Sequence, residues 1–217
     1  MKKINLYCVR HGETYFNTTH KIQGWSDSLL TEKVVLEATH VGQWINNNLQ
    51  LSSIYSSDLG RAKCTTKLIL SENDDSKSIP LDYLSYFREE FFGSFEGDRL
   101  NQLAGLLDMT QPVANDSELA AYVDEDEIMN QVKQSDPTHD AEDATTFWTR
   151  VQQGLEQIWS DSDDGDNILV VTHGAVIRKL AARTENHYYE NPANASISLF
   201  EMTDVLNLTL QKYNQCH

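Results

Sequence analysis

Two short apolar segments of this chain each end at a histidine and a glycine, and this repeated arrangement limits the possible folds most strongly. The first segment covers residues 4–9 and continues into Arg10, His11 and a glycine, within the stretch CVRHGETYFN. The second covers residues 168–171 and continues into THGAVIRKL. Short apolar runs bounded by polar turns are typical of buried strands. The repeat therefore predicts two buried strands, each presenting a histidine at its carboxyl end and followed by a helix.

The rest of the chain alternates between helical and strand patterns. Thr31 is predicted to cap a helix whose apolar residues recur every three or four positions up to Leu49. Strands are expected at 53–55, at 79–83, where Pro80 suits an edge or a strand start, and in the alternating tail at 206–211. Further helices are expected at about 61–70 and 147–159. Strands interleaved with helices predict an α/β fold with an open, mostly parallel, doubly wound sheet and helices on both faces.

The charge of the chain is strongly negative and unevenly distributed. The formal net charge of −16 argues against nucleic acid or an anionic membrane as a partner, since both favour clustered cations. Residues 108–143 carry eleven acidic residues against one basic residue, Lys133. We expect a helical or loop insert at about 100–145 within a single domain of 217 residues. A solvated acidic surface is favoured there over an acidic binding site.

The termini and the cysteines exclude several other classes of protein. The apolar run near the N-terminus is too short for a signal peptide, and no run reaches transmembrane length, which predicts a cytoplasmic protein. Cys8, Cys64 and Cys216 are widely spaced, without a C-x-x-C pair. Neither a disulfide framework nor a metal site is therefore expected, and no cofactor is predicted. Both a monomer and a dimer are compatible with the sequence.

The expected fold brings the chemically active residues together. In open parallel sheets ligands bind beyond the carboxyl ends of the strands, at a topological switch point. If the two central strands are neighbours, His11 and His173 face each other there. Arg10 and Arg61 also lie at turns that follow strands. Arginine forks and helix N-termini are suitable donors for a tetrahedral oxyanion, so an anion of this kind is the expected ligand.

These residues lie in motifs that resemble a known family. RHGET, with Asn17 shortly after it, resembles the signature of the histidine phosphatase superfamily, in its phosphoglycerate mutase-like branch. Five further stretches match that pattern in order: QGWSDSLLTEKV, SSDLGRAKCTT, FREEFFGSFEG, VVTHGAVIR and NASISLFE. The resemblance spans about residues 4–201, interrupted by the acidic insert. Leu29, Val34 and Phe95 depart from the residues usual in the family, and none of these three touches the implied chemistry.

The resemblance implies a role for each matching residue. His11 is implied to be the nucleophile that becomes phosphorylated, and Glu89 the proton donor to the leaving oxygen, with its neighbour Glu90 as the alternative. The residues implied to surround the phosphoryl group or border the substrate are Arg10, Asn17, Gln23, Gly24, Arg61, His173 and Gly174. An attacking imidazole has to be neutral, and nearby cations lower its pKa while they neutralise the phosphate. Glu89 has to hold a proton until the leaving group departs.

Three functions are compatible with this reading. The favoured one is a metal-independent phosphatase that hydrolyses small phosphomonoesters through a phosphohistidine, because fixed cations replace a metal at the transferring group. The alternative is a cofactor-dependent phosphoglycerate mutase, which needs extra cations over the site to hold a bisphosphorylated intermediate. The insert offers only Lys133, with Arg99 just before it, so hydrolysis is favoured. A catalytically inactive phosphate-binding protein is disfavoured because all five catalytic positions carry competent side chains.

Overall fold

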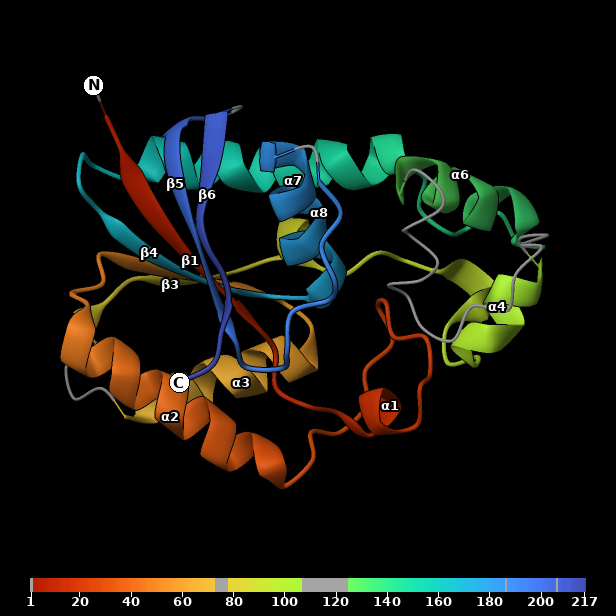
Figure 1. The fold of residues 1–217 in the computed structure, drawn as a ribbon, viewed down its shortest axis with the longest axis horizontal. Helices are drawn as coiled ribbons and strands as arrows, with labels where there is room; N and C mark the ends of the chain where they lie inside the picture. The colour runs from red at the N-terminus through yellow and green to blue at the C-terminus, as the bar shows by residue number, and fades with distance from the viewer. Residues whose placement is uncertain (1, 73–77, 107–124, 186, 206) are drawn as a thin grey trace.

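A six-stranded sheet forms the centre of the computed structural model, which describes residues 2–72, 78–106, 125–185, 187–205 and 207–217. The strand order is β3-β2-β4-β1-β5-β6 (Figure 1). The bounds are β1 Ile4–Arg10, β2 Ser53–Ser57, β3 Leu81–Leu84, β4 Asn167–Thr172, β5 Ile197–Asp204 and β6 Asn207–Gln215. The first four strands in this order run parallel, and β5 is antiparallel to both of its neighbours. The predicted open, mostly parallel sheet is therefore confirmed.

The two strands that end in His-Gly are neighbours at the centre of this sheet. β1 pairs with β4 in parallel, and the register places Val9 opposite Val171 and Arg10 opposite Thr172. β4 is buried from Ile168 to Thr172, and in β1 buried residues alternate with half-buried ones up to Cys8, because helices cover the two faces of the sheet. The next residue of each strand, His11 or His173, consequently lies at the same edge of the sheet.

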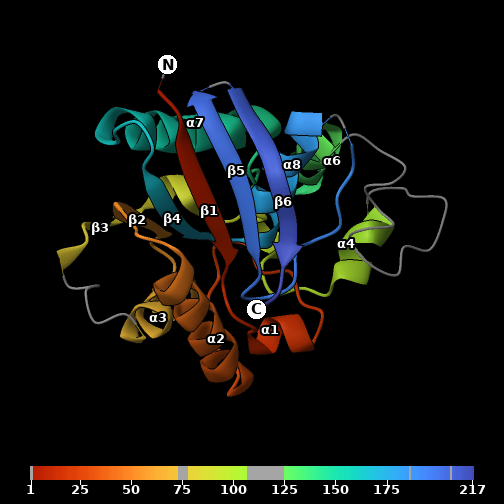
Figure 2. The ribbon, with the colours of Figure 1, turned by 60° about the vertical axis from the view of Figure 1, so that its left-hand side comes forward.

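Two layers of helices cover the sheet (Figures 1 and 2). α2 (Lys33–Asn48) and α3 (Gly60–Ser71) lie on one face, and α7 (Ala144–Asp161) and α8 (Gly174–Glu185) on the other. Each layer has its own apolar core, as the predicted helical spacing requires. On α7, for example, Phe147, Val151, Leu155 and Ile158 are all buried. Full burial of one such side chain stabilises the fold by roughly 1.5–3 kcal/mol. No helix in the described ranges is long and apolar enough to cross a membrane.

Several predicted boundaries differ from those observed. The prediction that Thr31 caps the second helix is wrong: its hydroxyl donates to Glu13 at 3.0 Å, and α2 begins at Lys33 with no side-chain cap. The strand expected at 79–83 is Leu81–Leu84, and it lies at the edge of the sheet, as Pro80 suggested. The tail alternates as predicted, with half-buried Leu208 and Leu210 between exposed neighbours, while Leu206 lies outside the described residues.

The remaining helices lie around the site and the insert. They are α1 (Tyr15–Thr18), α4 (Leu100–Leu106) and α6 (Glu125–Ser135), with 3-10 turns at Ser85–Phe87 and Gly93–Phe95. The described parts of the insert are thus largely helical, and α4 and α6 stand beside the sheet rather than over it (Figure 1). The acids Asp108, Asp116, Glu118 and Asp124 lie outside the described residues.

The expectation of a solvated acidic surface is wrong for two acids of the insert. Asp136 is 1% exposed and Glu142 is 5% exposed. Asp136 accepts hydrogen bonds from the hydroxyl of Ser94 at 2.5 Å and from the backbone N–H groups of Asp140 and Ala141 at 2.9 and 3.0 Å. A buried carboxylate is tolerated when donors surround it in this way. Asp136 therefore ties the end of α6 to the turn that contains Ser94.

Candidate active site

The rings of His11 and His173 face each other at the carboxyl ends of β1 and β4. Their centroids are 5.1 Å apart and their planes are inclined by 58°. Both side chains are buried, with 3% of His11 and none of His173 exposed. The structure therefore brings together the two histidines that the sequence placed at separate strand ends.

The backbone around His11 fixes which ring nitrogen carries the proton. Its Nδ1 lies 2.8 Å from the carbonyl oxygen of Gly12, which can only accept, so Nδ1 is the protonated nitrogen and Nε2 keeps its lone pair. Burial, followed by the charges of Arg61 and Arg10, lowers the pKa of His11 well below its usual value. The ring is therefore neutral at pH 7. A Cβ on Gly12 would lie 1.5 Å from Val34, so close packing against α2 requires glycine.

Arg61 is held rigidly at the start of α3. Its side chain donates to the carbonyl oxygens of Gly24 at 2.7 Å and Ser26 at 3.0 Å, and forms an ion pair with Asp27 at 3.0 Å. Asp27 also accepts from the backbone N–H of Gly60 at 2.6 Å, which stabilises the same helix N-terminus. The charge of Arg61 lowers the pKa of both active-site histidines, after the larger effect of burial.

Arg10 approaches the start of α8 at Gly174. Its guanidinium donates to the carbonyl oxygen of Pro192 at 2.6 Å. A Cβ built on Gly174 would lie 3.2 Å from Nε of Arg10 and 3.1 Å from Oδ1 of Asn191. Glycine at this position therefore leaves room for the guanidinium beside the helix N-terminus.

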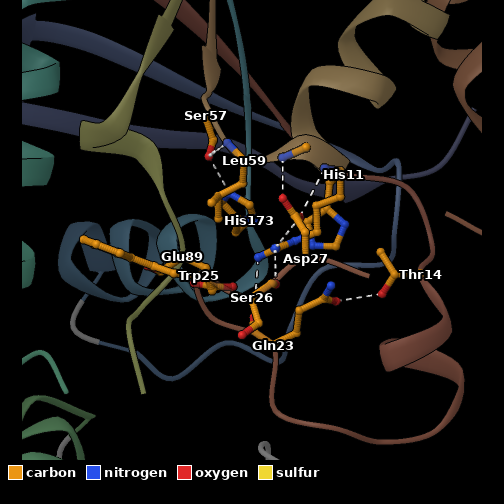
Figure 3. A network of polar contacts seen from close by, with 12 residues as sticks. His11, Thr14, Gln23, Trp25, Ser26, Asp27, Ser57, Leu59, Glu89 and His173 are labelled. Atoms are coloured by element: carbon orange, nitrogen blue, oxygen red, sulfur yellow. Dashed lines mark hydrogen bonds and ion pairs between the residues drawn. The ribbon is translucent and has the colours of Figure 1, made fainter. Parts of the chain in front are cut away.

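Two amide side chains after β1, Asn17 in α1 and Gln23 in the next loop, use their oxygens as acceptors within the protein. The oxygen of Asn17 accepts from the backbone N–H of Thr14 at 3.1 Å and from Asn194 at 3.3 Å, so its NH₂ group is the remaining polar group. The oxygen of Gln23 accepts from the hydroxyl of Thr14 at 2.7 Å (Figure 3). Nε2 of Gln23 is buried and has no hydrogen-bond partner in the described part of the chain. Both side chains are thereby oriented as donors, which suits an anionic ligand.

Gly24, which the resemblance implied to border the substrate, lies against Glu96 and Arg61. Its N–H donates to Glu96 at 3.1 Å and its carbonyl accepts from Arg61, so both backbone groups are engaged within the protein. A Cβ there would lie 2.1 Å from the carbonyl oxygen of Glu90. Gly24 therefore holds Arg61 and allows close packing of two loops.

The neighbouring carboxyl groups of Glu89 and Glu90 point to different partners. Glu89 accepts from the backbone N–H of Ala175, in the first turn of α8, and from the N–H of Glu90, both at 3.1 Å. Glu90 lies 3.7 Å from Nζ of Lys179, and burial raises its pKa to about 7 against the opposing charge of Lys179. Glu89 is thus the carboxyl that contacts the helix start two residues beyond His173.

Sequence reasoning missed three side chains that support this site. The hydroxyl of Ser57 lies 2.7 Å from Nε2 of His173 (Figure 3), and it accepts from the N–H of Leu59 at 3.4 Å. When this hydroxyl donates to Nε2, the proton of the His173 ring is on Nδ1, which is then a donor. Glu96 accepts from four backbone N–H groups, those of Gly24, Trp25, Ser26 and Phe92. Asp27 is the third. The sequence signal for all three was their presence within the family-like blocks.

Comparison with known proteins identifies the family. The family model of the histidine phosphatase superfamily (branch 1) matches residues 6–215. The chain belongs to this family. It is 30% identical to phosphoglycerate mutase-like protein 4 of Arabidopsis thaliana, over 94% of this chain and 81% of that protein. It is 27% identical to a broad-specificity phosphatase of Saccharomyces cerevisiae, over 85% and 72% of the two chains.

Solved structures agree with this family and with the fold. The phosphoglycerate mutase from Bacillus anthracis str. Sterne is 32% identical, with a TM-score of 0.88 over 99% of this chain and 94% of that one. The resemblance inferred from the motifs is therefore confirmed. Members of the family are phosphatases or mutases, and relatives of this chain carry both kinds of name. In the described ranges, no group of three or more His, Cys, Asp or Glu side chains could hold a metal ion.

Proposed function

We propose that this protein is a metal-independent phosphatase that hydrolyses small phosphomonoesters through a phosphohistidine on His11. The observation that carries the proposal is the hydrogen bond from Nδ1 of His11 to the carbonyl of Gly12. It leaves the lone pair of Nε2 available for attack on phosphorus. The low pKa of His11, caused by burial and then by Arg61 and Arg10, keeps that lone pair free at neutral pH.

In the first step, Nε2 of His11 forms a bond to phosphorus as the bond to the leaving oxygen breaks. Glu89 gives its proton to that oxygen, so the organic product leaves as a neutral alcohol. The negative charge on the equatorial oxygens meets Arg10, Arg61 and the donor nitrogen of His173, with the amides of Asn17 and Gln23 as further donors. These groups are fixed before the reaction, so little reorganisation is required.

In the second step, water attacks the phosphohistidine. The carboxylate of Glu89 takes a proton from that water as its oxygen bonds to phosphorus. The bond from phosphorus to Nε2 breaks, which releases inorganic phosphate and restores neutral His11. The proposed cycle needs no cofactor.

The ion pairs of three cations near the insert, Lys133, Arg178 and Lys179, favour hydrolysis over mutase activity. Lys133 forms an ion pair with Asp143 at 3.2 Å. Arg178 and Lys179 of α8 both form ion pairs with Glu125 at 3.2 Å. Each of these three cations is thus already paired with a carboxylate of the chain itself, whereas a bisphosphorylated intermediate requires cations that are available to it. The names of the mutase relatives support the alternative, a cofactor-dependent phosphoglycerate mutase.

A panel of phosphate esters separates these two functions. We expect phosphate release from several alkyl and aryl phosphomonoesters, and slower or undetectable isomerisation of 3-phosphoglycerate in the same preparation primed with 2,3-bisphosphoglycerate. Both rates are measured together, with the His11→Ala variant as the blank. Isomerisation faster than phosphate release would assign the protein to the mutases.

Phosphatase activity is expected to survive treatment with EDTA. The guanidinium groups of Arg10 and Arg61 supply the positive charge that a metal would otherwise provide. The measurement compares the initial rates of untreated, chelated and metal-supplemented protein. Activity that was lost on chelation and regained with a divalent ion would contradict the metal-independent mechanism.

A further inference from the structure

An arginine of α7 holds the backbone that carries Glu89. The guanidinium of Arg150 donates to three carbonyl oxygens in the segment that leads to Glu89: those of Tyr86 at 2.9 Å, Arg88 at 2.7 Å and Glu89 itself at 2.8 Å. Arginine is the side chain best suited to this task, because its donors form a rigid planar fork. One side chain thus fixes the path of this segment up to the acid.

Glu142, at the end of the acidic insert, completes the arrangement. Its carboxylate accepts two hydrogen bonds from Arg150, at 2.6 and 2.8 Å. It also accepts from the backbone N–H of Phe91 at 3.1 Å, and its own N–H donates to the carbonyl of Phe91 at 2.8 Å. The pair therefore contacts the chain on both sides of Glu89.

The pair is buried and its donors are fully used. The side chains of Arg150 and Glu142 are 12% and 5% exposed. All three nitrogens of Arg150 have hydrogen-bond partners, so the guanidinium has little freedom to rotate. Charge-assisted bidentate pairs in a dry environment are strong and directional. Such a pair restrains the backbone more tightly than a surface ion pair would.

The restraint matters because a general acid has to lie within hydrogen-bond reach of the leaving oxygen. The carbonyl of Glu89 is held by Arg150 and by the indole N–H of Trp25, at 2.8 Å each, while its carboxylate contacts the N–H of Ala175 at 3.1 Å. With the carbonyl held, the carboxyl group is directed at the start of α8. A displacement of about 1 Å at such a group can lower a rate by about a hundredfold.

We infer that Arg150 and Glu142 form a positioning clamp for Glu89, an inference that rests on the proposed function of Glu89 as the general acid. The clamp residues do not touch the substrate. They act on the reaction by fixing the place of the acid, and Glu142 connects the end of the acidic insert to catalysis.

The test compares two leaving groups in the Arg150→Lys variant. Lysine keeps the positive charge, which contributes to the low pKa of His173 after burial and Arg61, but it cannot bind three carbonyls and a carboxylate at once. Phosphorylation of His11 is measured under single-turnover conditions. We expect a loss of about tenfold or more with an alkyl phosphate, which needs a proton, and under about threefold with p-nitrophenyl phosphate, which hardly does.

A matched control is the Arg183→Lys variant. Arg183 is also a helical arginine paired with an acid, Asp126 at 3.3 Å, but its side chain is 54% exposed and lies in the last turn of α8. Both substrates should react within about twofold of the wild-type rate, since exposed ion pairs contribute little. Thermal unfolding of each variant is measured alongside. Equal slowing of both substrates in Arg150→Lys would overturn the clamp and leave a structural role.

Combining Arg150→Lys with Glu89→Gln separates the clamp from the proposed acid. If the clamp acts through Glu89, Arg150→Lys should add no further selective loss on the alkyl phosphate when Glu89→Gln is already present. A selective loss from Arg150→Lys in that background as large as in the wild type would overturn the clamp alone. If Glu89→Gln by itself shows no dependence on the leaving group, the acid assignment fails, and the clamp fails with it.

Trp25→Phe provides a second variant with a smaller effect on folding. It removes one hydrogen bond to the carbonyl of Glu89 and keeps an aromatic ring beside Phe91, which stacks on Trp25 at 4.8 Å. We expect the alkyl phosphate to react about three- to tenfold more slowly, the value of one hydrogen bond, with a smaller change for p-nitrophenyl phosphate. If Arg150→Lys does not fold, the test rests on Trp25→Phe. Equal slowing of the alkyl phosphate and p-nitrophenyl phosphate by Trp25→Phe then overturns the inference.

Discussion

Replacement of His11 by alanine is expected to abolish turnover. Nε2 of His11 is the proposed site of phosphoryl attachment, whereas Nε2 of His173 is engaged by Ser57 at 2.7 Å. Direct attack by water would need Glu89 as a base in the step where it is proposed to act as the acid. We measure kcat and the acid-labile phosphoenzyme trapped after rapid mixing. A variant that kept more than about a tenth of the wild-type kcat, a barrier change under about 1.4 kcal/mol, would disprove the nucleophile assignment.

His173→Ala provides the comparison for this result. His173 is proposed to donate to the phosphoryl oxygens, so its loss removes one of several fixed donors and leaves a weak residual activity. His40→Ala is the neutral control, because His40 is exposed on α2, away from the ends of β1 and β4. Phosphoenzyme should form slowly in His173→Ala, normally in His40→Ala and not at all in His11→Ala.

The sheet and the two histidines could be predicted because their signals are local. Each strand is a short apolar run, each histidine follows directly, and parallel strands place their ends at one edge. The pairing of β1 with β4 then brings the ring centroid of His11 to 5.1 Å from that of His173. The burial of β4 from Ile168 to Thr172 follows from its apolar run.

The lack of a side-chain cap on α2 could not be predicted because the observed partner of Thr31 is distant in the sequence. Thr31 has the local features of an N-cap, yet Glu13 accepts its hydroxyl hydrogen at 3.0 Å. The bond to Glu13 orients the Thr31 side chain through a tertiary contact that local propensity cannot predict, and no side-chain cap bond forms on α2. The same limit applies to Glu96, whose four backbone donors include residues about seventy positions away.

The burial of two acids in the insert could not be predicted from the number of charges in the sequence. A run of acids predicts a solvated surface on average, but Asp136 and Glu142 are buried because donors surround them. Arg150, the main partner of Glu142, lies on the next helix and carries no motif of its own. The partners of such acids become visible only when the fold places the two segments together.

Glu89→Gln is expected to slow the transfer from alkyl phosphates far more than the transfer from p-nitrophenyl phosphate. Glutamine keeps the shape of the side chain, but its single oxygen can accept from only one of the two N–H groups that Glu89 binds, those of Ala175 and Glu90, and it cannot supply the acidic proton. General acid catalysis contributes about 10²–10⁴-fold, so the alkyl ester should lose activity in that range. Phosphorylation of His11 is followed in a single turnover, because Glu89 also assists the later attack by water.

Glu90→Gln is the matched control, one residue away and equally buried. The pKa of Glu90 is raised to about 7 by burial, which by itself would suit a proton donor, but its carboxylate lies beside Lys179 at 3.7 Å. Glu89 instead contacts the start of α8 near His173, so we expect Glu90→Gln to affect both esters alike. Should Glu90→Gln carry the leaving-group dependence, the acid role moves by one residue and the two-step mechanism through His11 remains. Equal effects in both variants would move the acid role to another group.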